Sequence, residues 1–338
     1  VELTNKKGGI LSWEDRYTET TIIVPATVVN PNDGQTYTVK RIGDWALHSS
    51  LVKHFEMPTT VEEIGYRSFR QVNLQDQLVF HEGLRNVGRE SFDNAGYGPG
   101  LDLTLTLPST CDSIGWMNFA HAFTTGTVDL SRCSKLKYIV GLVFHRGNIH
   151  TLKLPEGLLV IGERTFDNNK LVSLDIPSTV KKIEVGAFAS NPTLKEVNLR
   201  KLSIVPLTTS PVYAGHIAPF EGAHPDLKIY VNTDQAALYT TDQVWKQHAG
   251  HYVETVNIGA TGYTSYYLEN ENFEIPTGCT AYIITGITHS GSATTPDQAV
   301  VKAFGAGKII PKQTGFVLQG APNSTVEYKA AVTGTEES

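Results

Sequence analysis

Apolar residues recur in pairs along this chain, an aliphatic residue being followed five positions later by a large apolar one. The aliphatic members lie 22, 23, 27, 25, 22 and 22 residues apart, by subtraction of their positions. Such a repeat is typical of a solenoid, because one unit of strand and turn buries its apolar face only against its neighbours. We therefore expect the paired residues to form continuous apolar columns. The seven pairs are Ile42/Leu47, Ile64/Phe69, Val87/Phe92, Ile114/Phe119, Ile139/Phe144, Ile161/Phe166 and Ile183/Phe188.

A short alternating segment precedes the pairs, as in Leu105–Pro108 (LTLP), Leu152–Pro155 (LKLP) and Leu174–Pro177 (LDIP). Apolar residues two apart share one side of a strand, so these segments predict strands with the intervening residue facing outward. Proline cannot donate to a strand ladder and therefore marks the end of each strand. In five repeats the last inward strand residue lies seven positions before the next aliphatic residue, which indicates that one turn geometry is reused.

A glycine follows the aliphatic residue in five of the seven repeats. We expect it to provide either an unusual backbone conformation or a close approach that a side chain would block. Val140 and Glu184 stand at this position in the other two repeats, where we expect local deviations. The five glycines are Gly43, Gly65, Gly88, Gly115 and Gly162.

The ends of the repeat region predict caps, which a solenoid needs because its terminal unit exposes an open sheet edge. The turn sequence Asn30–Gly34 (NPNDG) lies between residues 21–25 and 36–39 and predicts a hairpin that closes the first unit. Residues 201–226 lose the period and carry four prolines. A strand over 228–231 and a helix from residue 233 or 234 to about 248 are expected next.

From about Thr255 the period is absent and the composition shifts towards Thr, Gly, Tyr and Ala. Short strands are predicted between Gly and Pro turns. We therefore predict two domains, a capped solenoid over residues 1–254 and a small β-sandwich-like domain over residues 255–338. The predicted strands of the second domain cover residues 264–268, 280–287, 309–310 and 315–318.

Residues 171–188 (LVSLDIPSTVKKIEVGAF) resemble the BspA-like leucine-rich repeat, whose units read roughly Leu-x-x-Leu-x-Ile-Pro-x-x-Val-x-x-Ile-Gly-x-x-Ala-Phe. Glu184 departs from that pattern, and the resemblance covers about residues 20–254. It implies a leucine-rich repeat solenoid of strands joined by irregular or short helical turns, about 22–23 residues per repeat. It also implies a bacterial surface or secreted protein with an adhesive or host-interacting role. Residues 256–263 and 310–315 resemble C-terminal β modules of secreted bacterial surface proteins.

Composition narrows the function classes. The 338 residues include 28 Lys and Arg against 34 Asp and Glu, a formal net charge of −6. No run of basic residues is present, which argues against a nucleic-acid partner. No apolar run reaches the roughly 20 residues of a membrane span. The chain begins at Val1 without a signal sequence, and we expect that it starts after processing or trimming.

Three cysteines are too few for a disulfide scaffold. Cys111 lies three residues after Pro108, where other repeats carry an apolar residue, so we expect it to be buried. Cys133 follows one repeat later, which leaves a bridge between Cys111 and Cys133 open. Cys279 has no candidate partner nearby.

The outward residues of the seven strands predict a polar concave face, a surface through which solenoids commonly bind proteins. The alternative is a solvated ladder without a partner. The fourteen outward residues of the seven strands include no Trp, Tyr or Phe. This argues against a glycan on this face, because glycan sites rely on aromatic platforms. The central row is Glu56, Val79, Thr106, Asp129, Lys153, Asp175 and Asn198, flanked by His54, Gln77, Thr104, Thr127, Thr151, Ser173 and Glu196. The candidate partner-binding residues are Glu56, Asp129, Lys153, Asp175 and Asn198.

The 27-residue repeat carries its surplus in Asp93–Gly100, where Tyr97 is a candidate anchor of an edge loop. Insertions in solenoids gather on one edge and sometimes carry recognition, although a tolerated loop is the simpler alternative.

His248 and His251, with His216 and His224 upstream, are the one candidate metal cluster. Their spacing does not match a zinc site and no thiol accompanies them, so ordinary polar cap residues are the favoured interpretation. No metal or cofactor is therefore expected.

The sequence contains no nucleophile elbow, phosphate-cradling glycine loop or zinc-binding helix motif. Asp129 and Asp175 lie two repeats apart, roughly 10 Å between strands, on a face too shallow for glycosidase chemistry. We expect a non-enzymatic, adhesin-like surface or secreted protein that binds a host or matrix protein through the concave face or an edge loop. A structural spacer whose C-terminal domain performs the recognition is the first alternative, and an enzyme ranks last.

Overall fold

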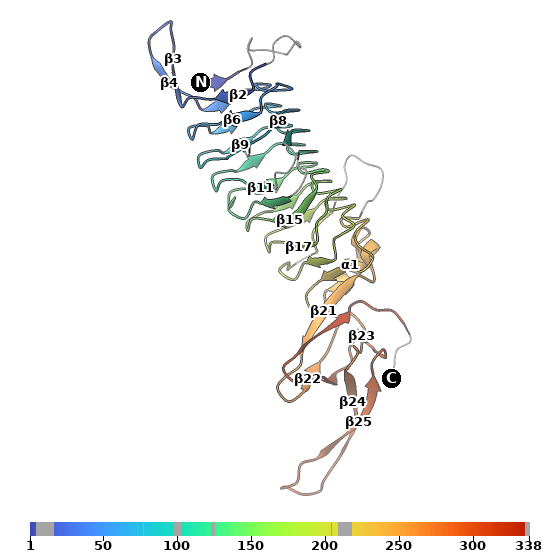
Figure 1. The fold of residues 1–338 in the computed structure, drawn as a ribbon. Coiled ribbons are helices and arrows are strands. Elements are labelled where there is room, and N and C mark those ends of the chain that lie inside the picture. Colours follow the sequence, from blue (N-terminus) through green and yellow to red (C-terminus); the bar gives the residue numbers. More distant parts are fainter. Residues whose placement is uncertain are drawn as a thin grey trace. The chain divides into compact units, whose positions relative to one another are not determined.

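The computed structural model describes residues 1–4, 17–76, 78–97, 103–122, 126–203, 205–208 and 218–334. Its fold is a β-solenoid of about eight turns over residues 41–253, followed by a C-terminal antiparallel sheet region (Figure 1). The predicted solenoid and the all-β region after it are thus confirmed. The chain forms two compact units, unit 1 with residues 1–197 and 202–225, and unit 2 with residues 198–201 and 226–338.

One side of each coil in unit 1 is a two-residue strand that ends on the aliphatic member of a pair. Neighbouring coils pair in parallel, with Ile64 beside Ile42 and Val87 beside Ile64. This sheet stops after the strand at Ile114, and a second sheet begins at Ile139, in the coil where Val140 replaces glycine. The first sheet contains β1 (Glu2–Leu3), β5 (Arg41–Ile42), β7 (Glu63–Ile64), β9 (Asn86–Val87) and β12 (Ser113–Ile114). The second contains β14 (Tyr138–Ile139), β16 (Val160–Ile161) and β18 (Lys182–Ile183).

The recurrence of glycine after the aliphatic residue reflects a close approach of neighbouring coils. A Cβ on Gly88 would lie 2.8 Å from the Ile64 carbonyl oxygen, and one on Gly115 would lie 2.3 Å from the Arg89 nitrogen. Left-handed backbone falls two residues later, for example at Arg67 (φ 52°), so it is not what these glycines provide. The deviation expected at Glu184 does not interrupt the backbone hydrogen bonds between coils, because the Glu184 N–H still donates to the Ile161 carbonyl at 3.0 Å.

The large apolar members form the predicted column. Phe69, Phe92, Phe119, Phe144, Phe166 and Phe188 are each 2% exposed or less, and their rings stack with centroids 4.8–5.4 Å apart. That separation matches the distance between adjacent strands, roughly 4.8 Å, so each coil contributes one ring. Phe220 extends the column, 5.7 Å from Phe188, although it lies in a segment without the sequence period.

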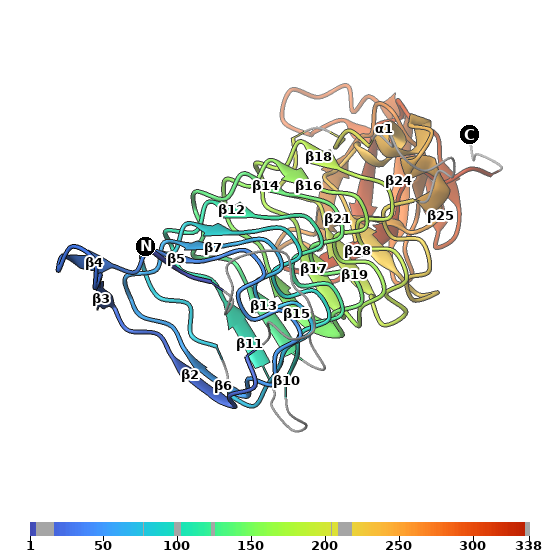
Figure 2. The same cartoon turned by 90° about the horizontal axis from the view of Figure 1, so that it is seen from above.

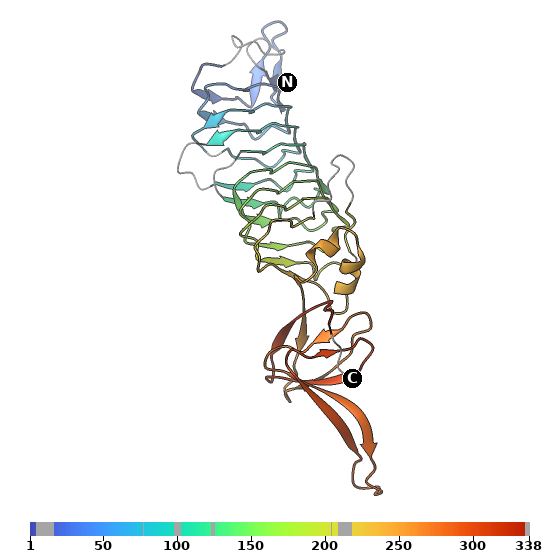
Figure 3. The ribbon, with the colours of Figure 1, turned by 90° about the vertical axis from the view of Figure 1, so that its right-hand side faces the viewer.

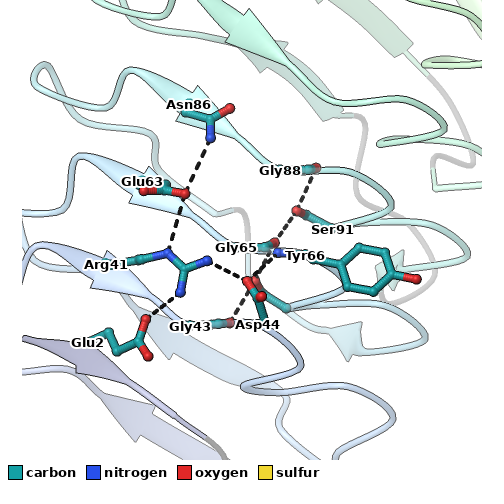
Figure 4. Close-up of polar contacts among 11 residues, drawn as sticks. Glu2, Arg41, Gly43, Asp44, Glu63, Gly65, Tyr66, Asn86, Gly88 and Ser91 are labelled. Atoms are coloured by element: carbon teal, nitrogen blue, oxygen red, sulfur yellow. Dashed lines mark hydrogen bonds and ion pairs between the residues drawn. The ribbon is translucent and has the colours of Figure 1, made fainter. Parts of the chain in front are cut away.

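Buried polar side chains complete the hydrogen bonds between coils. Ser91 Oγ donates to the carbonyl oxygens of Gly65 and Gly88 at 2.6 and 2.8 Å, as Figure 4 shows. Asn191, fully buried, donates to the Phe166 carbonyl at 3.0 Å and accepts the Leu171 N–H at 3.1 Å. Because buried backbone groups are costly to leave unpaired, these side chains stabilise the stack.

The other long side of the coils carries the predicted outward-facing strands (Figure 2). These strands do not form one continuous ladder. β2 pairs with β6, β11 pairs with β13, and β13 pairs with β15. The described residues 78–85, which include Val79, contain no strand. The strands are β2 (Thr21–Ile23), β6 (His54–Glu56), β11 (Leu103–Thr106), β13 (Gly126–Asp129), β15 (Ile149–Lys153), β17 (Ser173–Asp175) and β19 (Glu196–Asn198). β8 (Asn73–Leu74) and β10 (Gly96–Tyr97) form a separate parallel pair.

The predicted N-terminal hairpin is present with a different first strand. β3 (Thr27–Val29) pairs antiparallel with β4 (Thr36–Thr38) around the expected turn, where Gly34 has φ 67°. Residues 21–23, expected in that hairpin, pair in parallel with β6 instead. The prediction was wrong here because parallel pairing with the next coil extends the solenoid, which a local turn signal does not reveal.

Unit 2 begins with the irregular last turn of the solenoid. β20 (Lys228–Tyr230) pairs with β21 (Tyr252–Asn257), so the boundary predicted after residue 254 falls inside β21. The single helix expected here is two shorter ones, α1 (Ala236–Thr241) and a 3-10 helix (Trp245–His248). Asp242 causes the break, because its carboxylate accepts the N–H groups of Val244 and Trp245 at 2.8 and 3.0 Å. Within the described residues, no helix could cross a bilayer.

The rest of unit 2 is antiparallel. Its main sheet has the order β22-β27-β24-β25, and β24 with β25 forms a long hairpin (Figure 3). The core of unit 2 consists of Phe273, Phe316 and Tyr328 packed with aliphatic residues that include Val256, Ile275 and Ile310. The strands are β22 (Tyr263–Tyr266), β23 (Phe273–Glu274), β24 (Thr280–Thr288), β25 (Gln298–Gly305), β26 (Ile309–Ile310), β27 (Phe316–Gln319) and β28 (Thr325–Lys329).

Candidate functional site

The parallel strands β11, β13 and β15 bring together the middle of the predicted outward rows. Thr106 lies beside Asp129, and Asp129 beside Lys153, in one row. Thr104, Thr127 and Thr151 form the second row in the same register. Between the two rows Leu105, Val128 and Leu152 point inward and are 9% exposed or less. This alternation confirms that the two rows face outward on one surface, called here the threonine face.

An ion pair marks the centre of the threonine face. Lys153 Nζ lies 3.0 Å from Asp129 Oδ2, and the Ser131 hydroxyl donates to Asp129 Oδ1 at 2.6 Å. Burial by itself would raise the pKa of Asp129, but the bonds from Ser131 and Lys153 outweigh it and hold that pKa below its usual value. The Asp129 carboxylate is therefore fixed and negatively charged, and the Lys153 side chain beside it remains 57% exposed.

The other predicted site residues are not all part of this surface. Glu56 is exposed on β6, separated from β11 by the strandless segment around Val79. Asp175 is exposed on β17, the next coil after β15 (Figure 1). Asn198 belongs to unit 2, and its side-chain oxygen accepts the Arg200 N–H at 3.1 Å. The continuous seven-strand face expected from the sequence is therefore reduced to the threonine face and its neighbour β17.

The structure adds one residue to the surroundings of Glu56. Ile23 of β2 pairs with Glu56 and is 64% exposed. The sequence predicts a strand around Ile23, but only the parallel pairing of β2 with β6 shows that Ile23 lies beside Glu56.

Tyr97 is the last residue of β10, where it pairs with Leu74. Of the loop that it was expected to anchor, Asp93–Gly100, residues 98–100 lie outside the described residues. Its role as an edge anchor stays a prediction.

Two members of the candidate histidine cluster, His248 and His251, lie close together, and the His251 N–H donates to the His248 carbonyl at 3.0 Å. His248 is 5% exposed, and burial together with His251 lowers its pKa to about 4, so it is neutral at physiological pH. His251 Nδ1 contacts the Leu227 carbonyl at 3.0 Å, and His216 lies outside the described residues. In the described part of the chain, no group of three or more His, Cys, Asp or Glu side chains could hold a metal ion.

The disulfide left open between Cys111 and Cys133 is not formed. Both cysteines are free and fully buried, and the Cys133 thiol donates to the carbonyl oxygens of Leu107 and Pro108 at 3.6 and 3.5 Å. Burial raises the pKa of Cys111 to about 12 and that of Cys133 to about 11, so neither is a reactive thiolate.

In the described part of unit 2, two carboxyl groups are buried, those of Glu254 and Glu271. Glu254 accepts the N–H groups of Asp234, Gln235 and Ala236 at 2.9–3.3 Å, and so caps the start of α1. Glu271 accepts the Ala331 N–H at 2.5 Å. Burial first, and then the charge on Glu254, raise the pKa of Glu271 well above its usual range. Glu271 is therefore protonated at neutral pH and serves packing.

Replacing Glu271 with glutamine is expected to stabilise the protein at pH 8 by about 1–3 kcal/mol and to have little effect near pH 4. A raised folded-state pKa means that stability is fully present below the unfolded value and is lost as the pH rises towards the folded value. Glutamine removes this slope because it stays neutral, and it keeps an oxygen for the Ala331 N–H. Chemical denaturation at pH 4, 6 and 8 measures the effect, with the exposed Glu269→Gln as control. Equal pH slopes in wild type and Glu271→Gln would contradict it.

Comparison with known proteins identifies the repeats. The family model for the BspA type leucine rich repeat region matches in 6 copies, over residues 35–120 and 97–206. The solved structures that resemble the chain include a leucine-rich cell surface protein from Faecalibacterium prausnitzii A2-165, with 19% identity over 66% of this chain and 68% of that chain, and a TM-score of 0.46. No curated protein sequence matches the chain.

Two further structures are similar to the chain. One is a leucine-rich repeat protein from Bacteroides ovatus ATCC 8483, with 19% identity, coverage of 63% of each chain and a TM-score of 0.34. The other is the pneumococcal vaccine antigen PcpA, with 14% identity over 65% of this chain and 79% of that chain, and a TM-score of 0.27. The matches to the repeat model together span residues 35–206, more than half of the 338 residues. The chain therefore belongs to the BspA-type leucine-rich repeat family.

Proposed function

We propose that this chain is a non-enzymatic bacterial surface or secreted protein that binds a protein partner through the threonine face and the adjoining Asp175. The observation that carries the proposal is the register of β11, β13 and β15, which presents two rows of outward polar side chains around the Asp129–Lys153 pair. Membership of the BspA-type family supports a protein-binding role, and the F. prausnitzii protein is described as a cell surface protein.

The rigidity of the threonine face suits such a role. Its strands are fixed by the inward Leu105, Val128 and Leu152, so a partner would meet a surface that needs little rearrangement. Short threonine side chains lose little conformational entropy on contact. The Asp129–Lys153 pair supplies charges of both signs at fixed positions, which orient a partner and disfavour mismatched ones.

Two features argue against catalysis on this face. The Asp129 carboxylate is held by Lys153 and Ser131, so it is not available to share or transfer a proton. The pair of carboxylates considered from the sequence, Asp129 and Asp175, is interrupted by the strand that carries Lys153. A general acid and base would need to flank a substrate closely, and these two do not.

Replacing Lys153 and Asp175 together with alanine is expected to weaken partner binding roughly ten-fold and to leave the melting temperature unchanged within about 1 °C. Both side chains are exposed, so little packing is lost. Binding of the full chain to immobilised fibronectin, laminin and fibrillar collagen, measured by surface plasmon resonance, provides the readout.

The matched control is Lys181→Ala, which removes an exposed lysine directly before β18 on the opposite side of the coil. It should leave the affinity unchanged. If the double variant binds as tightly as wild type, the binding surface lies elsewhere, and the edge near Tyr97 becomes the next candidate. If wild type binds none of the three proteins, a matrix-binding role is rejected.

A further inference from the structure

Where it covers the core of unit 2, the sheet β22-β27-β24-β25 has a buried face and an exposed face. Cross-strand partners share a face, and register places Leu318, Ala281 and Phe304 side by side. All three are 6% exposed or less and belong to the core of unit 2. Successive residues of a strand alternate in direction, so the residues on either side of these three point outward.

Two rows of uncharged side chains cross the outward face. In the first row Gln319 pairs with Tyr263 on one side and Thr280 on the other. In the second row Val317 pairs with Ser265 and Tyr282. The Tyr282 hydroxyl donates to Gln319 Oε1 at 2.7 Å and joins the two rows. These six residues, together with Tyr267, are called here the tyrosine face.

A hollow of about 610 Å³ lies at one end of the tyrosine face. Tyr267 and Ile284 line it, 54% and 56% exposed, with Ser265, Gly315 and Val317 between them. A Cβ built on Gly315 would meet nothing within 4 Å, so packing does not require glycine at this position. The missing side chain therefore leaves the hollow open. Its size falls within the range of small-ligand sites, roughly 300–1,000 Å³.

We propose that the tyrosine face binds a neutral polysaccharide, with one sugar ring seated in the hollow against Tyr267. A sugar ring has faces of C–H groups and a rim of hydroxyls, so it needs an aromatic or aliphatic wall and nearby polar groups. Tyr267 and Ile284 supply the walls, and Ser265 and Gln319 supply a hydroxyl and an amide along the same face. Exposed tyrosine suits this use because its ring is apolar and its hydroxyl is polar.

Charge selects a neutral ligand. No member of the tyrosine face is charged, and Lys302 of β25 belongs to the opposite face, where its amine lies 5.1 Å from the centroid of the Phe304 ring. An acidic polysaccharide would find no cation here. A protein partner would find none of the arginine that such interfaces favour. Clustered exposed rings and aliphatic side chains on one sheet face still call for a partner, because soluble proteins rarely leave such patches uncovered.

This inference goes beyond the protein-binding role proposed above and uses different residues. The threonine face belongs to unit 1 and the tyrosine face to unit 2, so substitutions in one leave the other intact. The two proposals therefore succeed or fail separately.

Affinity electrophoresis of the full chain in gels containing starch, glucomannan, galactomannan or mixed-linkage β-glucan tests the proposal. We expect at least one of these neutral polysaccharides to retard the protein, and polygalacturonate and heparin not to. Tyr267→Ala and Gly315→Val should each weaken the retardation at least ten-fold, the first by removing a wall and the second by filling the hollow. Tyr138→Ala, which removes a tyrosine that is 57% exposed in unit 1, is the matched control and should change nothing.

Thermal melting of each variant checks that the fold is intact, and Gly315→Val keeps the test valid if Tyr267→Ala misfolds. Several outcomes would overturn the proposal: no retardation by any neutral polysaccharide, retardation that persists in both variants, or equal retardation by the acidic polymers. Sedimentation analysis adds another. If wild type is a dimer that Tyr267→Ala dissociates, the face is a contact between copies of the chain and not a glycan site.

Discussion

Replacing Phe166 with alanine is expected to lower the free energy of unfolding by about 3–5 kcal/mol, the range found for buried phenylalanine. Phe166 is fully buried, and its ring lies between those of Phe144 and Phe188, with centroid distances of 5.2 and 5.3 Å. Alanine would leave a cavity in the middle of a rigid column. The neighbouring rings cannot move towards each other to close this cavity, because their coils are fixed by backbone hydrogen bonds. Urea denaturation followed by circular dichroism measures the change.

The control for this prediction is Val172→Ala, which shortens an apolar side chain that is 53% exposed in the following coil. It should cost a few tenths of a kcal/mol. Phe166→Leu should fall between the two, since leucine refills part of the cavity. An unfolding curve for Phe166→Ala that overlays the wild-type curve would show that the ring does not support the stack.

Replacing Asn191 with alanine is expected to cost about 3 kcal/mol, although asparagine is polar. Its amide donates to the carbonyl oxygens of Phe166, Phe188 and Ala189 at 2.8–3.2 Å, and its oxygen accepts the Leu171 N–H. Alanine removes all four bonds at a site that is fully buried, so several backbone groups lose their partner without gaining water. The same urea denaturation detects the loss.

Asn191→Asp separates hydrogen bonding from side-chain size. Aspartate keeps the oxygen for Leu171 but brings a carboxylate against three carbonyl oxygens, so its folded-state pKa should be raised. The destabilisation should therefore be largest at pH 7 and shrink as the pH falls, because protonation restores a neutral donor. Ser178→Ala, at an exposed position, should have almost no effect. A loss in Asn191→Ala no larger than in Ser178→Ala would mean that water replaces the amide.

The core of the solenoid was predictable because each sequence repeat forms one coil, so the same positions are buried in every coil. Every coil must place an aliphatic residue and a large apolar one at the same depth, and the positions of Ile161 and Phe166 follow from that requirement alone. Glycine after the aliphatic residue also left a clear signal, because a side chain there would strike the preceding coil. Phe220 left none, since it joins the column from a segment whose spacing differs from the repeat.

The candidate site was predictable in part. The outward rows through Asp129 and Lys153 follow from strand alternation, and the register of β13 and β15 brings them together as expected. The break around Val79 was not expected, because the apolar spacing is kept there and only the backbone pairing is lost. β25 escaped prediction for a related reason. Both of its faces are exposed over most of its length, so the strand lacks the alternation that marks a half-buried strand.

The structure of unit 2 was the least predictable from the sequence, because its elements are fixed by contacts between residues far apart in the chain. The helix expected over residues 233–248 was divided by the Asp242 cap, and the carboxylate of Glu254 reaches α1 from a distant strand. Likewise, Tyr263, Tyr267 and Tyr282 are scattered in sequence, and only the antiparallel register of β22, β27 and β24 gathers them on one face.

The sequence by itself determined the repeat, its family and the residues that fill the columns, because stacking forces each coil to repeat the same inward pattern. Only the tertiary structure decided which outward residues are neighbours, where the strand ladder is interrupted and how the tyrosines assemble. The physical reason is that burial constrains side chains strongly and periodically, whereas exposed side chains are constrained only through the register of the strands that carry them.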